Sequence, residues 1–420
     1  MRADTVVLAA GPERPQALGR ALALFANFFF IILAYYQVKA ASRSLLIEYG
    51  GAEALPYAWV YSALTLVVAI AGYHVIVAKF ERVRVVLGSL LVFAGLLVLF
   101  RTVFTPRDLS SATAFYVFVD LFSVVLVEQF WSLTDSVSSS EEGRRSFWFV
   151  GTGGLVGGVL GGLLASRLVQ PDMPFHTPDL LYVCAALLLV VWALNYAMYR
   201  AGVYAEVHEA PIREAGDWRV MFRNRYLVLI ALLLCCSQLA QPVVEYQFLD
   251  MAEREYVALD PRTAFISQFL SLLGLVSIAV NVVVTPLVHR LFGAIGGLLL
   301  QPLVLAASSG LFWLSPSLWT AGAMKIGDRG LSYSINRASK ELLYIPVDPV
   351  LTYQAKAWID MVGYRLFKGI GSGLILLALK LLPAASVAVD LAWLTIAICT
   401  VWALTVAQVA IAYRAVLARA

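Results

Sequence analysis

Long apolar runs recur from one end of this 420-residue chain to the other, separated by short polar stretches. A helix of about 20 residues rises about 30 Å, which is the thickness of a bilayer's hydrocarbon core. The pattern therefore predicts an all-α, polytopic membrane protein with about twelve transmembrane helices. The expected spans are residues 21–41, 54–78, 84–104, 111–134, 146–168, 179–199, 226–249, 263–288, 292–314, 317–338, 353–379 and 386–412.

The longest polar stretch, near residues 201–225, divides these spans six and six. We expect an N-terminal six-helix half over residues 1–200, a cytoplasmic linker over 201–225 and a C-terminal six-helix half over 226–420. Such a division is typical of transporters built from repeats related by an axis along the membrane normal. A weak internal echo agrees, since Asp120 lies in the fourth span and Asp328 in the tenth.

Composition supports a membrane protein and argues against a nucleic-acid partner. The chain is 61% hydrophobic and 14% charged, whereas soluble proteins carry about 25% charged residues. A formal net charge of +4 is too small to indicate nucleic-acid binding. Residues 1–20 contain Pro, Glu and Arg without a short apolar core, so we expect no cleaved signal and a first run that stays in the membrane.

Lysine and arginine gather in alternate loops, which predicts the orientation. If the spans alternate, most of these residues fall on one side, and the positive-inside rule then places both termini in the cytoplasm. The expected location is the bacterial inner membrane. The residues on that side are Arg2, Arg14, Arg20, Lys79, Arg82, Arg84, Arg144, Arg145, Arg200, Arg213, Arg219, Arg223, Arg225, Arg337, Lys340, Lys356, Arg414 and Arg419.

Nothing in the sequence resembles an enzyme, a cofactor site or a metal site. The four histidines lie at loop-like or span-end positions, and the four cysteines have neither metal-site spacing nor loop positions suited to a disulfide. Gly-Thr-Gly-Gly at 151–154 is not a phosphate loop, because no Gly-Lys-Ser/Thr follows it. Small residues spaced four apart favour close helix packing there instead.

Charged residues inside apolar spans are the candidate functional groups. A charge at membrane depth costs roughly 2.5–3.5 kcal/mol on insertion scales, so it normally marks an ion or substrate path. Both signs occur in both halves, which predicts a polar cavity suited to an anionic solute. The residues at issue are Asp120, Glu245, Lys325, Asp328, Arg365 and Lys368, with Lys39, Arg43, Glu128 and Asp360 as further candidates.

Blander interpretations of these residues stay open. Lys325 and Asp328 are three residues apart and can pair on one helix face, so internal neutralisation is as good an explanation as function. Arg43 and Glu128 can lie near span ends and reach the interface. Tyr35 and Tyr36 could stack on a flat ring, although lipid or core contact is the commoner role of such side chains.

Several stretches resemble the ATP/ADP translocases of plastids and obligate intracellular bacteria, a family unrelated to the mitochondrial carrier. They are VKAASRSLLIEYGGAEALPY, VDLFSVVLVEQFWSLTDSVSSSEEGRRSFWFVGTGG, NRYLVLIALLLCCSQLAQPVVEYQF and SYSINRASKELLYIPVDPVLTYQAKAWIDMVGYRLFKGIGSG. The resemblance implies a major-facilitator-like fold of two six-helix halves.

The same resemblance implies four residues for nucleotide binding or transport. The family's first-span lysine falls on Arg43, its two glutamates fall on Asp120 and Glu245, and its span-eleven lysine falls on Lys368. All four charge signs are kept, while two residue identities change. Arginine for lysine is not neutral, because a planar fork grips phosphate differently from a point charge.

We therefore expect a secondary transporter that moves nucleotides across a lipid bilayer by alternating access. The main alternative is a proton-coupled transporter of another phosphorylated or anionic solute, with Asp120 or Glu245 as the proton site. A non-transporting sensor module is less favoured, since only the 201–225 stretch could dock a partner. Such bundles can work as monomers.

Overall fold

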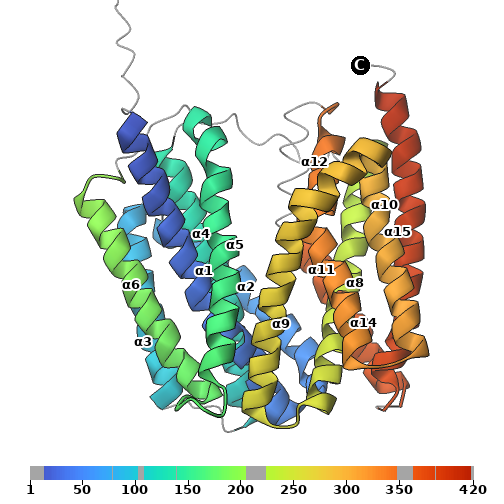
Figure 1. The fold of residues 1–420 in the computed structure, drawn as a ribbon, viewed down its shortest axis with the longest axis horizontal. Helices are drawn as coiled ribbons and strands as arrows, with labels where there is room; N and C mark the ends of the chain where they lie inside the picture. The colour runs from blue at the N-terminus through green and yellow to red at the C-terminus, as the bar shows by residue number, and fades with distance from the viewer. Residues whose placement is uncertain are drawn as a thin grey trace, which may run out of the picture.

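Helices make up nearly all of the part of the chain that the computed structural model describes (Figure 1). The prediction of an all-α chain is confirmed for this part. The described residues are 14–77, 79–102, 108–138, 140–204, 224–347, 363–383 and 385–417.

The first six long helices form one side of the molecule, called here the N-terminal group (Figure 1). Its α2 extends toward the other side, where it contacts α14 (Tyr364–Leu381). The members are α1 (Arg14–Gly50), α2 (Leu55–Val77), α3 (Arg82–Thr102), α4 (Leu109–Val137), α5 (Ser140–Leu168) and α6 (Leu180–Arg200), with the short helices η1 (Ala52–Ala54) and η2 (Thr177–Asp179) between them.

The remaining helices form the other side, called here the C-terminal group (Figure 1). Two of its helical paths are interrupted by π-helical turns. The members are α8 (Arg225–Glu255), α9 (Leu259–Ala279), η3 (Val280–Val284), α10 (Thr285–Leu314), α11 (Leu318–Leu331), η4 (Ser332–Asn336), α12 (Arg337–Tyr344), α14 and α15 (Val387–Leu417).

Nine stretches of described helix are long and apolar enough to cross a membrane. One of them, Leu259–Leu314, is 56 residues long and covers both the eighth and the ninth predicted span. A bend divides it at Gly293, whose φ of +66° suits glycine alone among common residues. The predicted tenth span corresponds to the continuous path α11–η4–α12, which is not among these nine stretches. These helices make the chain an integral membrane protein.

The glycine-rich face of α5 packs directly on α1, as the spacing of its small residues predicts. A Cβ at Gly157 would lie 2.3 Å from the carbonyl oxygen of Phe29, and one at Gly153 would lie 2.6 Å from that of Phe25. The two backbones therefore approach as closely as small residues allow. This contact holds α1, which carries Lys39 and Arg43, against α5.

A similar contact joins α8 to α14. Pro242 lies inside α8, and a Cβ at Gly371 of α14 would lie 2.6 Å from its Cγ. The proline ring therefore occupies the space that a larger residue at 371 would need. Lys368 lies one turn before this glycine, and Glu245 lies three residues after the proline.

The two groups meet at the end of the bundle opposite the chain termini, here called the closed end (Figure 1). Helix α1 begins and α15 finishes at the other end, so both termini leave the bundle on the same side. At the closed end a Cβ at Gly162 of α5 would lie 2.2 Å from Ser271 Oγ of α9. Ser271 Oγ donates a hydrogen bond to the carbonyl oxygen of Val159 at 2.9 Å.

Polar contacts reinforce the closed end. Buried Arg262 of α9 donates to Glu48 Oε2 at 2.5 Å and to the carbonyl oxygen of Ser44 at 3.0 Å. Glu253 of α8 accepts from the backbone nitrogen of Ala52 at 2.7 Å. Each contact crosses between the groups, so together they favour a conformation that is shut at this end.

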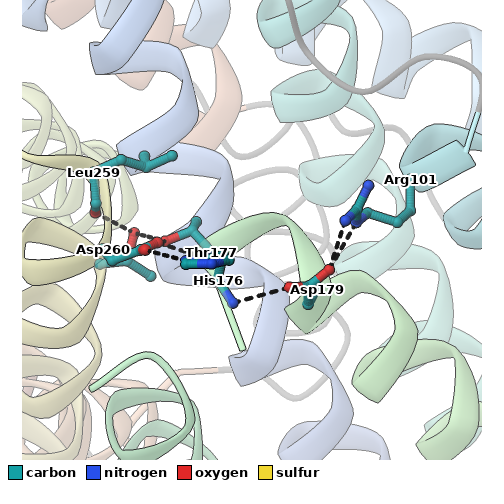
Figure 2. A network of polar contacts seen from close by, with 7 residues as sticks. Arg101, His176, Thr177, Asp179, Leu259 and Asp260 are labelled. Atoms are coloured by element: carbon teal, nitrogen blue, oxygen red, sulfur yellow. Dashed lines mark hydrogen bonds and ion pairs between the residues drawn. The ribbon is translucent and has the colours of Figure 1, made fainter. Parts of the chain in front are cut away.

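Figure 2 shows a second network at the closed end. Asp260 of α9 accepts from the backbone nitrogen and the hydroxyl of Thr177, both at 2.7 Å, and contacts His176 Nδ1 at 2.8 Å. Asp179 accepts from the backbone nitrogen of His176 at 2.9 Å and pairs with Arg101 at 2.7 Å. The α5–α6 connection is thus tied to the start of α9.

Candidate functional site

A cluster of charged side chains lies between the two groups of helices. Its members are far apart in the sequence. Glu245 of α8 is its central anion. Arg43 Nε of α1 lies 3.4 Å from Glu245 Oε1, and Lys325 Nζ of α11 pairs with Glu245 Oε2. One carboxylate thus bridges a cation from each group.

All three members of this bridge are shielded from solvent. The exposed fractions of the Arg43, Glu245 and Lys325 side chains are 11%, 15% and 3%. A buried charge is costly unless it is paired, and removing one partner of a buried pair typically costs about 3–5 kcal/mol. Each cation therefore depends on Glu245, or on another anion that replaces it.

Lys325 pairs differently from the local pairing that its spacing suggested. In the described part of the chain its ion pair is with Glu245, whereas Asp328 accepts from Gln301 Nε2 at 3.3 Å. Asp328 still interacts electrostatically with Lys325 and with Arg329. In place of the expected i, i+3 pair, Lys325 contacts α8 and Asp328 contacts α10.

Helix α1 contributes a second cation and three aromatic contacts. Lys39 Nζ lies 4.5 Å from the ring centroid of Tyr36 and 5.3 Å from that of Tyr35. The Arg43 guanidinium lies 5.5 Å from the ring of Tyr116. The negative faces of these rings stabilise cations without neutralising them. Tyr35 and Tyr36 therefore hold a positive charge rather than facing lipid alone.

Lys368 and Asp120 complete the cluster from α14 and α4. Lys368 interacts electrostatically with Asp120, Arg329 and Arg43. Asp120 also acts on Arg43. The four residues that the resemblance implied, Arg43, Asp120, Glu245 and Lys368, thus come together from α1, α4, α8 and α14.

The remaining candidates separate into three cases. Lys39, Lys325 and Asp328 belong to the cluster. Glu128 is exposed and acts on Tyr73, while Arg365 is half-buried on α14. Asp360 lies outside the described residues.

Arg329 belongs to the cluster although sequence reasoning did not select it. It acts electrostatically on Lys39, Lys325 and Lys368. Arg329 follows Asp328 directly in Lys-Ile-Gly-Asp-Arg, and neighbouring opposite charges suggest that they neutralise each other locally. The sequence feature that could have identified Arg329 is its position within a predicted span.

The described cluster therefore contains more positive than negative groups. Five cations face three carboxylates, an excess that leaves the site positive when all are charged. The cations are Lys39, Arg43, Lys325, Arg329 and Lys368, and the carboxylates are Asp120, Glu245 and Asp328. In a site of low dielectric constant such an excess attracts a multivalent anion strongly.

Comparison with solved structures identifies the fold as that of membrane transporters. A bacterial homologue of the iron transporter ferroportin in its inward-facing state matches with a TM-score of 0.65 and 15% identity, over 93% of this chain and 98% of that one. The nucleoside transporter NupG matches with a TM-score of 0.54 and 12% identity, over 96% and 99%. At these identities the likeness concerns the fold alone.

Comparison of sequences is more specific. "ADP,ATP carrier protein 1" of Chlamydia muridarum is 25% identical, with 91% of this chain and 88% of the relative covered. "ADP,ATP carrier protein 4" of Rickettsia felis is 24% identical, with 70% and 66% covered. The profile of the TLC ATP/ADP transporter family matches residues 109–324 and 317–413, which is more than half of the sequence. This chain belongs to the TLC ATP/ADP transporter family.

Proposed function

We propose that this protein exchanges nucleotides of the ATP and ADP type across a bacterial inner membrane, as a secondary transporter working by alternating access. The observation that carries the proposal is the surplus of cations between the two groups of helices. Membership of the family and the relatives' names supply the chemical class of the anion. Nucleotide phosphates carry enough negative charge to neutralise that surplus.

The proposal extends to the architecture. The N-terminal and C-terminal groups are taken as two six-helix halves, residues 1–200 and 226–420, joined by a cytoplasmic linker over 201–225. Both termini then face the cytoplasm. The contacts of Gly162 and Arg262 support alternation between two halves, because they shut one end of the bundle, as alternating access requires of a carrier in one of its states.

The bridge through Glu245 suggests how the empty carrier is stabilised. Without substrate, Glu245 pairs with both Arg43 and Lys325 and offsets one of their two positive charges. A bound phosphate chain supplies an alternative anion, so either Glu245 or the substrate can compensate the cations. Lys368 would hold the same phosphates from α14, while Asp120 would hold Lys368 when the site is empty.

The test is uptake of labelled ATP by proteoliposomes preloaded with ADP, with Lys368→Gln as the site variant. We expect the variant to lose about 2–5 kcal/mol of binding free energy, at least roughly thirtyfold in affinity. Lys380→Gln is the matched control, because Lys380 lies on the same helix and is exposed. It should transport as the wild type does.

The same experiment also tests the alternative that the protein transports another anionic solute. Uptake that needs internal ADP and fails only in Lys368→Gln supports exchange through this cluster. Folded protein that takes up no nucleotide, with or without a proton gradient, overturns the proposal and points to another phosphorylated anion.

A further inference from the structure

We propose that Arg329 is a substrate-binding residue that grips the phosphate chain from the C-terminal group, with Tyr333 and Gln241 as its positioning residues. The inference rests on the proposed function and deepens it by adding a ligand to the phosphate site. It also predicts that affinity depends on the number of phosphates through this arginine.

Arg329 is poorly matched to the carboxylate beside it. Its Nε lies 3.7 Å from Asp328 Oδ2, beyond hydrogen-bond distance. That Oδ2 is buried and accepts no hydrogen bond from the described residues. Residues that are adjacent on a helix do not face each other, so Asp328 cannot hold the guanidinium in a bidentate pair. Arg329 instead directs its donors elsewhere.

Neutral groups hold the guanidinium in place. Nη1 donates to the hydroxyl of Tyr333 at 3.1 Å, and the guanidinium lies 5.7 Å from the ring of the same residue. With its amide oxygen turned toward α11, Gln241 of α8 accepts from both terminal nitrogens, while its amide nitrogen donates to Gln238 Oε1 at 2.8 Å. These contacts orient Arg329 without removing its charge.

The side chain reaches open space rather than the core. Arg329 is 19% exposed, whereas Asp328 and Lys325 are 2% and 3% exposed. Tyr333 is 59% exposed, and it lies within electrostatic range of Tyr36 and Lys39 of α1. Open space therefore adjoins both groups of helices at the position of Arg329.

The surrounding cations favour binding of a further anion there. Arg329 interacts with the like charges of Lys39, Arg43, Lys325 and Lys368. Like charges at close range repel, and in a shielded site the repulsion exceeds that in water. A phosphate chain relieves this repulsion, and guanidinium groups bind phosphate oxygens in pairs. Since the cations come from α1, α11 and α14, a longer chain of phosphates can engage more of them.

The experiment measures binding of ATP, ADP, AMP and inorganic tripolyphosphate to purified protein by isothermal titration calorimetry. For Arg329→Gln we expect affinity for ATP and tripolyphosphate to fall roughly 10- to 100-fold, the range for a hydrogen bond to a charged group. Affinity for AMP should change less than about threefold, because the outer phosphates are absent. Arg329→Lys should recover part of the loss, since it keeps the charge without the fork.

Arg337→Gln is the matched control, since Arg337 lies eight residues further on and is exposed; it should bind all four ligands as the wild type does. The melting temperatures of the variants establish whether each one is folded. If Arg329→Gln does not fold, Arg329→Lys is the test variant in its place. Unchanged ATP affinity in either folded variant overturns the inference. Equal losses for ATP and AMP with tripolyphosphate unaffected also overturn it, because Arg329 would then contact the base. If the wild type binds no nucleotide, it is the proposed function that fails.

Discussion

Ion pairs join the two groups of helices in two regions, but the charge balance differs. At the closed end each cation has a carboxylate of its own: Arg262 pairs with Glu48, and protonated His176 pairs with Asp260. In the central cluster Glu245 is shared by Arg43 and Lys325, and further cations surround it. The first arrangement is complete by itself, so it can serve as a latch. The second contains more cationic side chains than carboxylates, so it is suited to an incoming anion.

The largest expected effect comes from replacing a glutamate by glutamine in each of the two regions and comparing the loss of stability. Glu245→Gln leaves Arg43 and Lys325 without their carboxylate, at a cost of about 3–5 kcal/mol in folding free energy. ATP should restore much of that loss, because phosphate replaces the missing charge. Thermal unfolding with and without ATP measures both effects.

Glu48→Gln is the matched substitution at the closed end. Glu48 is 37% exposed, and the buried Arg262 keeps the carbonyl oxygen of Ser44 as an acceptor, so removing the Glu48 carboxylate should cost less, about 1–3 kcal/mol. The ATP-induced shift in melting temperature should equal that of the wild type. An enlarged shift in Glu48→Gln, or none in Glu245→Gln, would remove the distinction between latch and binding site.

The second prediction tests whether the close packing of α5 on α9 keeps the closed end shut. Gly162→Ala places a methyl group where Ser271 Oγ and the carbonyl oxygen of Ser267 lie 2.2 and 2.6 Å away. Overpacking of this kind costs about 1–3 kcal/mol, and opening the closed end relieves it. Reaction of an impermeant maleimide with Ser267→Cys, in a background lacking the native cysteines, should become about tenfold faster.

Gly151→Ala is the control on the same helix, because nothing lies within 4 Å of a Cβ there. It should leave the maleimide rate unchanged. Equal rates in the Gly162→Ala and Gly151→Ala proteins would show that the α5–α9 contact does not govern opening.

The smallest effect concerns pH. The pKa of His176 is raised from its ordinary value, first by its hydrogen bond with Asp260 and then by the charges of Asp260 and Asp179, against the opposing charge of Arg101. Its contribution to the latch is therefore present below about pH 6.5 and is lost as pH rises through the raised pKa.

The maleimide assay at Ser267→Cys measures this change between about pH 6 and 9. The ratio of rates to those of the His176→Gln protein cancels the titration of the thiol itself. We expect that ratio to rise modestly with pH, because His176 is 74% exposed and the pair is screened by water. A constant ratio would leave Thr177 and Asp260 as the polar elements of the latch.

The sequence by itself determined the helical class, the positions of most spans and the residues worth examining. Apolar length decides whether a helix can cross a bilayer, and this information is local. The spacing of small residues in α5 likewise predicted its close packing, since neighbours four apart share one face of a helix. The intramembrane charges identified Asp120, Glu245 and Lys368 as candidates, because charges in lipid are costly, and the family resemblance added Arg43.

Only the tertiary structure decided which charges meet. Local spacing paired Lys325 with Asp328, but the approach of α8 brings Glu245 between Lys325 and Arg43. The same approach leaves Arg329 beside neutral acceptors and open space, which its sequence neighbours conceal. Partner choice depends on distances between helices far apart in the chain, and a pattern along one helix contains no information about them.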